Sequence, residues 1–189
     1  MRLGKSDPKR DRFERMAEEV FPSLYGTAIR LTRNTEDASD LSQEALVRAY
    51  EAFDRFDGRN FKAWMLRILT NLYINRYRKI QRTGTASSLS EEDAAEPIAP
   101  AEQSPERLVF DEMLPGEVER ALAEVPDVFR TAVILSDIEG MSYDEVAEAT
   151  DVPVGTVRSR LARGRAILRG LLESYALERG YLKHGTTND

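Results

Sequence analysis

The sequence predicts an all-α protein made of two small helical domains. Apolar residues recur at helical spacing in every periodic segment, and no segment shows the strict alternation of a half-buried strand. Residues 84–106 divide the chain, because small, polar and proline residues dominate there and large apolar side chains are few. We therefore expect a first domain at residues 1–83, a flexible acidic linker at 84–106, a second domain at 107–175 and a polar tail at 176–189.

The composition is that of a globular protein without disulfide or thiolate chemistry. Of the 189 residues 41% are hydrophobic and 32% are charged, the net charge is −6 and cysteine is absent. No apolar run approaches the roughly 18 residues of a membrane span, and the N-terminus lacks the apolar stretch of a signal peptide. The single histidine, His184, lies in a polar stretch, so candidate nucleophiles lack an activating partner. We expect a cytoplasmic protein that is not inserted in membranes, is not an enzyme and needs no metal or cofactor.

Three or four helices are predicted before the linker. Residues 10–20 are amphipathic, and Pro22 is placed in the first turn of a further helix that ends near Arg33. Asn34 and Thr35 close that helix and cap the next one. The predicted core residues of this next helix recur at helical spacing: Ala38, Leu41, Ala45, Ala49 and Phe53.

The outer surface of the same helix is acidic. Asp37, Asp40 and Glu44 share it, with Gln43 close by. Such a surface is either solvated or docks on another protein. A metal site is disfavoured, because no histidine or further carboxylate cluster completes the ligand set.

A long helix at residues 61–82, capped by Asn60, is predicted to carry two distinct faces. Its apolar face comprises Phe61, Trp64, Met65, Ile68, Leu69 and Leu72. Amides and cations follow one another at intervals of three and four along another face, which we name the amide stripe: Arg67, Asn71, Asn75, Arg78 and Arg82. Trp64, Tyr73 and Tyr77 can stack on unpaired bases while the cations hold the backbone, although Trp64 alone is equally typical of a core. The helix is thus predicted to bind single-stranded nucleic acid.

Residues 142–172 have the pattern of a helix-turn-helix. Ser142 and Glu145 have capping-box spacing, so a short helix begins near Tyr143 and buries Val146 and Ala147. After a break at residues 150–153, a second helix buries Val157, Leu161, Leu168 and Leu171. Its opposite side is predicted to expose only arginines: Arg158, Arg160, Arg163, Arg165 and Arg169. This pattern favours docking of the second helix in a DNA major groove, and the alternative is a solvated basic face.

Charge is strongly segregated along the chain. Residues 62–82 contain bases and no acid, residues 84–106 contain acids and no base, and the arginine-rich helix follows. Two basic elements separated by an acidic segment indicate two nucleic-acid contacts on a tether that itself avoids nucleic acid.

Three motifs in this order resemble the extracytoplasmic-function (ECF) sigma factors of bacterial RNA polymerase, a branch of the sigma-70 family. They are DASDLSQEALVRAY at residues 37–50, FKAWMLRILTNLYINRYRK at 61–79 and MSYDEVAEATDVPVGTVRSRLARGR at 141–165. The resemblance implies an N-terminal domain that binds core polymerase and opens the promoter −10 element. It also implies a C-terminal domain that reads the −35 element.

The resemblance assigns roles to individual residues. Contact with core polymerase, through the β′ clamp and the β flap, is implied for the first domain at Asp40, Gln43, Glu44 and Arg48. Binding of −10 DNA is implied for Phe56, Arg59, Asn60, Phe61, Lys62, Trp64, Arg67, Asn71, Asn75 and Arg78. Contact with −35 DNA is implied for Thr156, Arg158, Ser159, Ala162 and Arg163, although many relatives carry a bulkier side chain at position 162.

A regulatory partner is also implied by the resemblance. Sigma factors of this type are usually held by an anti-sigma protein, and residues 68–79 look most like the subgroup that responds to thiol oxidation. Because this chain has no cysteine, such a redox switch would sit on the partner, as a small zinc-binding anti-sigma protein. The alternative function is a stand-alone helix-turn-helix regulator whose N-terminal half is a sensor or dimerisation domain.

Overall fold

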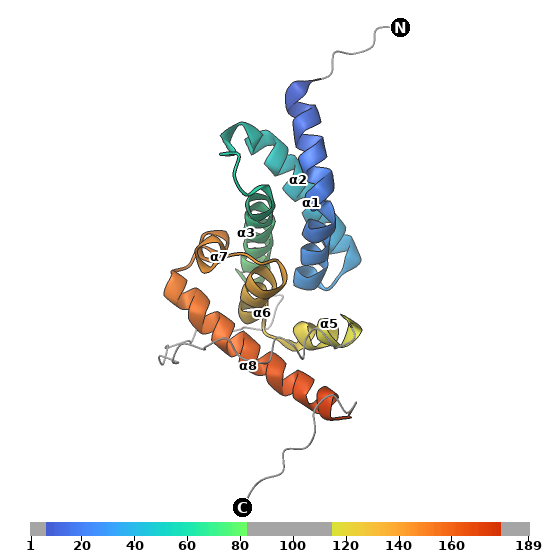
Figure 1. Cartoon of the computed structure of the whole chain (residues 1–189), viewed down its shortest axis with the longest axis vertical. Helices are drawn as coiled ribbons and strands as arrows, with labels where there is room; N and C mark the ends of the chain where they lie inside the picture. Colours follow the sequence, from blue (N-terminus) through green and yellow to red (C-terminus); the bar gives the residue numbers. More distant parts are fainter. Residues whose placement is uncertain (1–6, 83–114, 179–189) are drawn as a thin grey trace, which may run out of the picture.

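The computed structural model describes residues 7–82 and 115–178, and helices account for nearly all of both segments. The N-terminal half, residues 7–82, contains α1 (Pro8–Thr32), α2 (Thr35–Ala52), the short 3-10 helix η1 (Phe53–Arg55) and α3 (Phe61–Arg82). The C-terminal half, residues 115–178, contains α5 (Pro115–Glu124), α6 (Asp127–Val133), the π-helical turn η2 (Ile134–Ile138), α7 (Tyr143–Thr150) and α8 (Val154–Glu178). Neither half contains a strand, so the all-α prediction is confirmed (Figure 1).

The predicted boundaries of the linker and the tail stay predictions. Residues 84–106 lie outside the two described segments. Helix α8 ends at Glu178 and so extends into the segment that the sequence assigns to the polar tail.

Helix α1 corrects the prediction of a new helix at Pro22. One continuous helix of 25 residues runs through the proline, whose ring is exposed to solvent. Burial of Phe13 and Ala17 before Pro22, and of Leu24 after it, fixes both sides of the helix against its neighbours. This packing outweighs the cost of about 3 kcal/mol that an interior proline imposes on a helix.

The helix starts follow the capping residues expected from the sequence. The Asn34 side chain accepts hydrogen bonds from the backbone N–H groups of Glu36 and Asp37, and Asn60 Oδ1 accepts one from Ala63. At α7 the reciprocal capping box of Ser142 and Glu145 is complete. These local signals need no tertiary contact, and all three predicted caps are confirmed.

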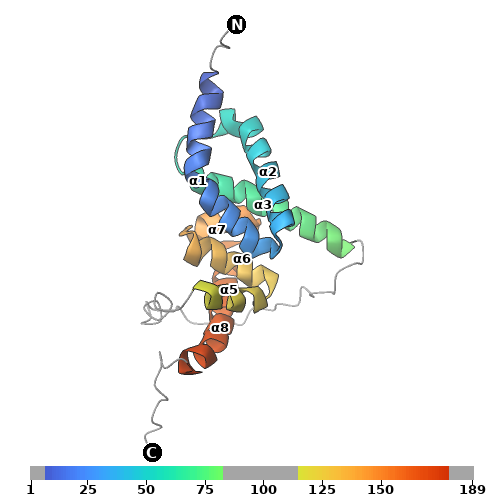
Figure 2. The ribbon, with the colours of Figure 1, turned by 90° about the vertical axis from the view of Figure 1, so that its right-hand side faces the viewer.

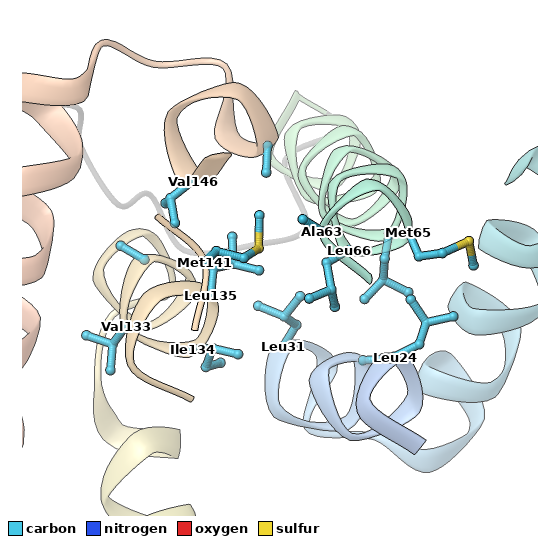
Figure 3. Close-up of a cluster of buried hydrophobic side chains, with 14 of the residues drawn as sticks. Leu24, Leu31, Ala63, Met65, Leu66, Val133, Ile134, Leu135, Met141 and Val146 are labelled. Carbon is cyan, nitrogen blue, oxygen red and sulfur yellow. The ribbon is translucent and has the colours of Figure 1, made fainter. Parts of the chain in front are cut away.

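The two halves share one hydrophobic core. Helices α6 and α7 lie against α1 and α3, and α8 crosses beyond them (Figures 1 and 2). Apolar side chains of both halves converge at this contact: Leu31, Ala63 and Leu66 from the first, and Ile134, Leu135, Met141 and Val146 from the second (Figure 3). The apolar face predicted for α3 did not include Ala63 or Leu66. Both are buried because α3 is covered on two sides.

Gly164 allows α8 to approach α6 closely. A Cβ atom at this position would lie 2.7 Å from Val133 Cγ2 and 3.2 Å from the Phe129 carbonyl oxygen. We expect Gly164→Ala to lower the free energy of unfolding by about 1–3 kcal/mol, because a backbone oxygen cannot yield as a side chain can. The matched control is Gly170→Ala on the same helix, where a Cβ meets nothing within 4 Å. It should raise stability by up to about 1 kcal/mol. Urea unfolding followed by circular dichroism measures both, and equal effects would contradict the close approach.

Candidate nucleic-acid interface

Helices α7 and α8 form the predicted helix-turn-helix. Val146 and Ala147 of α7 are buried against the domain, and Asp151 ends the helix in the left-handed conformation. On α8 the core positions are Val157, Leu161, Leu168 and Leu172. Leu171, predicted as core, is only half-buried, since Leu172 takes the inner position.

The arginines of α8 do not form the uniform exposed face that the sequence predicts. Arg158 and Arg169 are exposed, whereas Arg160, Arg163 and Arg165 are half-buried. Arg165 forms a two-pronged ion pair with Asp137 at 2.6 and 2.9 Å, and this hydrogen bonding raises the pKa of its guanidinium. Arg165 therefore joins α8 to η2.

The exposed arginine nearest the start of α8 is Arg158. Its guanidinium makes no ion pair with the described part of the chain, so it is available to an external acceptor. The other residues implied for −35 contact are half-buried on the same helix: Thr156, Ser159, Ala162 and Arg163. The Ser159 hydroxyl donates to the Thr156 carbonyl oxygen at 2.9 Å.

The amide stripe of α3 is partly accessible. Arg67 and Asn75 are exposed and Asn71 is half-buried, whereas the side chain of Arg78 lies outside the described part of the chain. Arg67 is not a bare cation, because its guanidinium pairs with Glu148 of α7 at 2.7 Å.

An aromatic cluster lies beside the stripe at the start of α3. The Trp64 ring centroid lies 5.1 Å from that of Phe56 and 5.7 Å from that of Phe61. Trp64 and Phe56 are half-buried and Phe61 is buried, so the cluster presents ring surface while being anchored in the core. Arg59, next to this cluster, is exposed, with its guanidinium 3.7 Å from Asp57. Aromatic faces beside cations are the surface on which unpaired bases stack.

Tyr73 belongs to the core contact between the two halves and not to the base-stacking surface. Burial, reinforced by the charge of Asp127, raises the pKa of Tyr73 to about 12. Arg130, beside it, is completely buried and donates to the Leu31 carbonyl oxygen at the end of α1 at 3.2 Å. Arg130 also pairs with Asp127.

Glu139 is the residue that sequence reasoning missed. It follows η2, and its carboxylate, with 5% of the side chain exposed, accepts hydrogen bonds from the hydroxyls of Ser23 and Thr27 on α1. Lys62 of α3 pairs with it at 2.9 Å and Arg30 at 3.8 Å. The signal was invisible in the sequence because these partners are separated from Glu139 by long stretches of chain.

The donors around Glu139 stabilise its charge despite its burial. Desolvation alone would raise the pKa of this carboxyl, but the hydrogen bonds from Ser23, Lys62 and Thr27 outweigh it, and the pKa is lowered. Ionised Glu139 therefore favours packing of the halves at pH values above the ordinary carboxyl pKa. That contribution is lost as the pH falls through the lowered pKa.

The outer surface of α2 is open. Asp40, Gln43 and Arg48 are exposed, and the Asp40 carboxylate has no ion pair within the described residues. Glu44 is half-buried between Arg76 at 2.6 Å and Arg48 at 3.8 Å, so it differs from the fully exposed acid that the sequence predicts. Val47, one turn beyond Gln43, adds an exposed apolar side chain.

The described residues contain no group of three or more side chains suited to hold a metal ion. None of the described helices combines the length and the apolar run that crossing a bilayer requires.

A helix-turn-helix with an exposed arginine, joined in one chain to a helix with amides, cations and aromatic rings, defines a DNA-binding protein with two separate contacts. Comparison with known proteins places it further. Residues 16–83 match the family model for Sigma-70 region 2, and residues 116–168 match that for Sigma-70 region 4. The N-terminal half therefore contains region 2, and the C-terminal half contains region 4.

Relatives of known function match most of the chain. It is 32% identical to the ECF RNA polymerase sigma factor SigW of Bacillus subtilis, over 84% of this chain and 88% of that protein. It is 37% identical to the ECF RNA polymerase sigma factor SigE of Mycolicibacterium smegmatis, over 82% of this chain. That match spans only 59% of SigE.

Solved structures agree in fold. The sigma factor RpoE of Bartonella quintana, solved with the anti-sigma factor NepR, superposes with a TM-score of 0.65 at 30% identity, over 86% of this chain and 97% of that one. CnrH, solved with the cytosolic domain of CnrY, is similar in fold, with a TM-score of 0.58 at 24% identity, over 87% of this chain and 90% of that one. The chain belongs to the ECF sigma factors of the sigma-70 family, which are transcription initiation factors that direct RNA polymerase to promoters.

Proposed function

We propose that this protein binds core RNA polymerase through α2 and recognises promoters by two separate DNA contacts. Helix α8 reads the −35 duplex, and α3 with the preceding loop captures unpaired bases of the −10 element. The observation that carries this division is the different chemistry of the two helices. Arg158 offers a guanidinium fork near a helix start, as major-groove reading needs, whereas α3 offers amides beside Trp64 and Phe56.

The polymerase contact is assigned to the open surface of α2. Asp40, Gln43 and Arg48 are exposed there, and Val47 supplies apolar area. A surface with polar groups around an exposed apolar residue has the anatomy of a protein-docking site. We place the β′ clamp on this surface and the β flap on region 4, joined by residues 84–106 as an acidic linker. The protein acts in the cytoplasm by binding, without catalysis of its own.

Run-off transcription tests this function. Core polymerase from a related bacterium is supplied with genomic promoter fragments, with and without the full-length protein, and transcripts are mapped at their 5′ ends. Discrete transcripts that depend on the protein are expected. Tight binding to promoter duplex without polymerase, and no protein-dependent transcript, would favour a stand-alone regulator instead.

Asn71→Ala is expected to impair opening of the −10 element while leaving duplex binding intact. Asn71 is half-buried on the amide stripe, so its side chain reaches the surface without forming the core. Loss of one amide contact to a flipped base should reduce permanganate reactivity of −10 thymines several-fold. Polymerase retention on the −35 duplex is the internal control. Normal permanganate reactivity would place base capture elsewhere.

An anti-sigma protein is proposed as the regulatory partner. Two similar structures are complexes of sigma factors with such proteins or their domains. For this chain we propose further that the partner is a zinc-binding, redox-sensing protein, because the chain has no cysteine with which to sense oxidants itself. Copurification from the native host, with and without a thiol oxidant, tests this. A partner without cysteines, or one that oxidant does not release, would exclude the redox version.

A further inference from the structure

Three residues assigned to −10 DNA already contact carboxylates of region 4. Asn60 Nδ2 donates to Glu145 at 2.9 Å, Lys62 pairs with Glu139 at 2.9 Å, and Arg67 pairs with Glu148 at 2.7 Å. We name Glu139, Glu145 and Glu148 the carboxylate set.

The carboxylate set is positioned by local structure in region 4. Glu145 is fixed by the capping box of α7, where the Ser142 backbone N–H keeps its pKa below the ordinary value. Glu148 lies one turn further along α7 and so faces the same neighbouring helix, α3. Glu139 follows the π-helical turn η2, whose backbone accepts the Glu139 N–H at Ile134 O.

Apolar burial holds the two regions in this arrangement. Leu66 of α3 and Ile134 and Leu135 of region 4 are completely buried at the contact, close to Met141 (Figure 3). The carboxylates therefore lie at the edge of a packed core and are not isolated surface pairs.

We propose that the free protein is closed, with the carboxylate set of region 4 occupying the side chains of region 2 that bind −10 DNA. The proposal rests on the proposed function, because it concerns the same −10 residues. A carboxylate presents the charged oxygens that a DNA phosphate presents, so Lys62 and Arg67 cannot pair fully with both. Closure and −10 binding are then mutually exclusive.

The closed form leaves the polymerase-binding surface accessible. Asp40, Gln43 and Arg48 of α2 remain exposed while Lys62 is paired and half-buried. Docking on polymerase can therefore precede opening, and the free protein would not bind single-stranded DNA at large. The order of events follows from which surfaces are covered.

Binding of a fluorescein-labelled, mixed-sequence 20-nucleotide single strand to the full-length protein tests the competition. Glu139→Gln with Glu148→Gln removes two carboxylates that face region 2. We expect binding to become roughly three- to tenfold tighter. The matched control is Asp144→Gln with Glu173→Gln, which removes the same charge from exposed positions of region 4 without ion pairs in the described part of the chain. Glu148→Gln alone should act in the same direction, and its exposed position protects the fold if the double variant is unstable. Equal affinities of both double variants would overturn the proposal.

The closed form itself is measured by a distance between two labels. Because the chain has no cysteine, Glu18→Cys on α1 and Gly170→Cys on α8 carry the only two spin labels. Both positions are exposed. A narrow distance distribution is expected in the free protein, and a longer distance after addition of core polymerase. A broad distribution in the free protein would overturn the closed form. Absence of run-off transcription with the unsubstituted protein would instead overturn the proposed function, so the two failures are distinguishable.

Discussion

Asp40→Arg combined with Glu44→Arg is expected to abolish binding to core RNA polymerase and, with it, promoter-dependent transcription. Both residues lie on the outer surface of α2, and Asp40 is fully exposed without an ion pair in the described residues. Reversal of a charge places like charges together at an interface, which costs several kcal/mol, and each 1.4 kcal/mol is a tenfold change in affinity. We therefore expect a loss of about a hundredfold or more.

The structure shows how the two substitutions differ in their effect on the fold. Asp40→Arg breaks no contact, whereas Glu44→Arg places a third cation between Arg76 and Arg48. Asp40→Arg alone should therefore weaken polymerase binding with an unchanged melting temperature. Glu18→Arg on α1 makes the same charge change at an exposed position away from α2 and is the control. Pull-down with core enzyme measures binding. Full retention of the double variant would remove α2 as the docking surface.

Arg158→Ala is expected to weaken recognition of the −35 duplex by about 1–3 kcal/mol, the usual contribution of a side chain that reads a base. Arg158 is exposed near the start of α8 and has no ion pair to lose within the described residues, so its removal should leave the fold unchanged. Arg165→Ala should behave differently, because this residue joins α8 to Asp137 and its loss acts through stability.

Promoter binding by the holoenzyme, measured on templates with the native and a scrambled −35 sequence, separates reading from general attraction. Arg158→Ala should reduce the preference between the two templates. Arg15→Ala, which removes an equal charge from an exposed position on α1, should not. An unchanged preference in Arg158→Ala would mean that this arginine contacts phosphate only.

Much of the candidate site was predictable from the sequence because its signals are local. Helical spacing places Asn71 and Asn75 on one stripe of α3, and the capping box at Ser142 fixes where α7 begins. The uniform arginine face of α8 was wrong, since Asp137 is distant in sequence and no periodicity shows that it pairs with Arg165.

By itself the sequence determined the helices, their caps and the two kinds of DNA-binding chemistry, because capping and side-chain spacing act within a few residues. Only the tertiary structure decided that α1 continues through Pro22, that Ala63 and Leu66 are buried, and that Glu139 lies between α1 and α3. Each of these depends on contacts between distant segments, where burial of apolar surface and pairing of a buried charge outweigh local preference. A sequence read segment by segment does not contain those contacts.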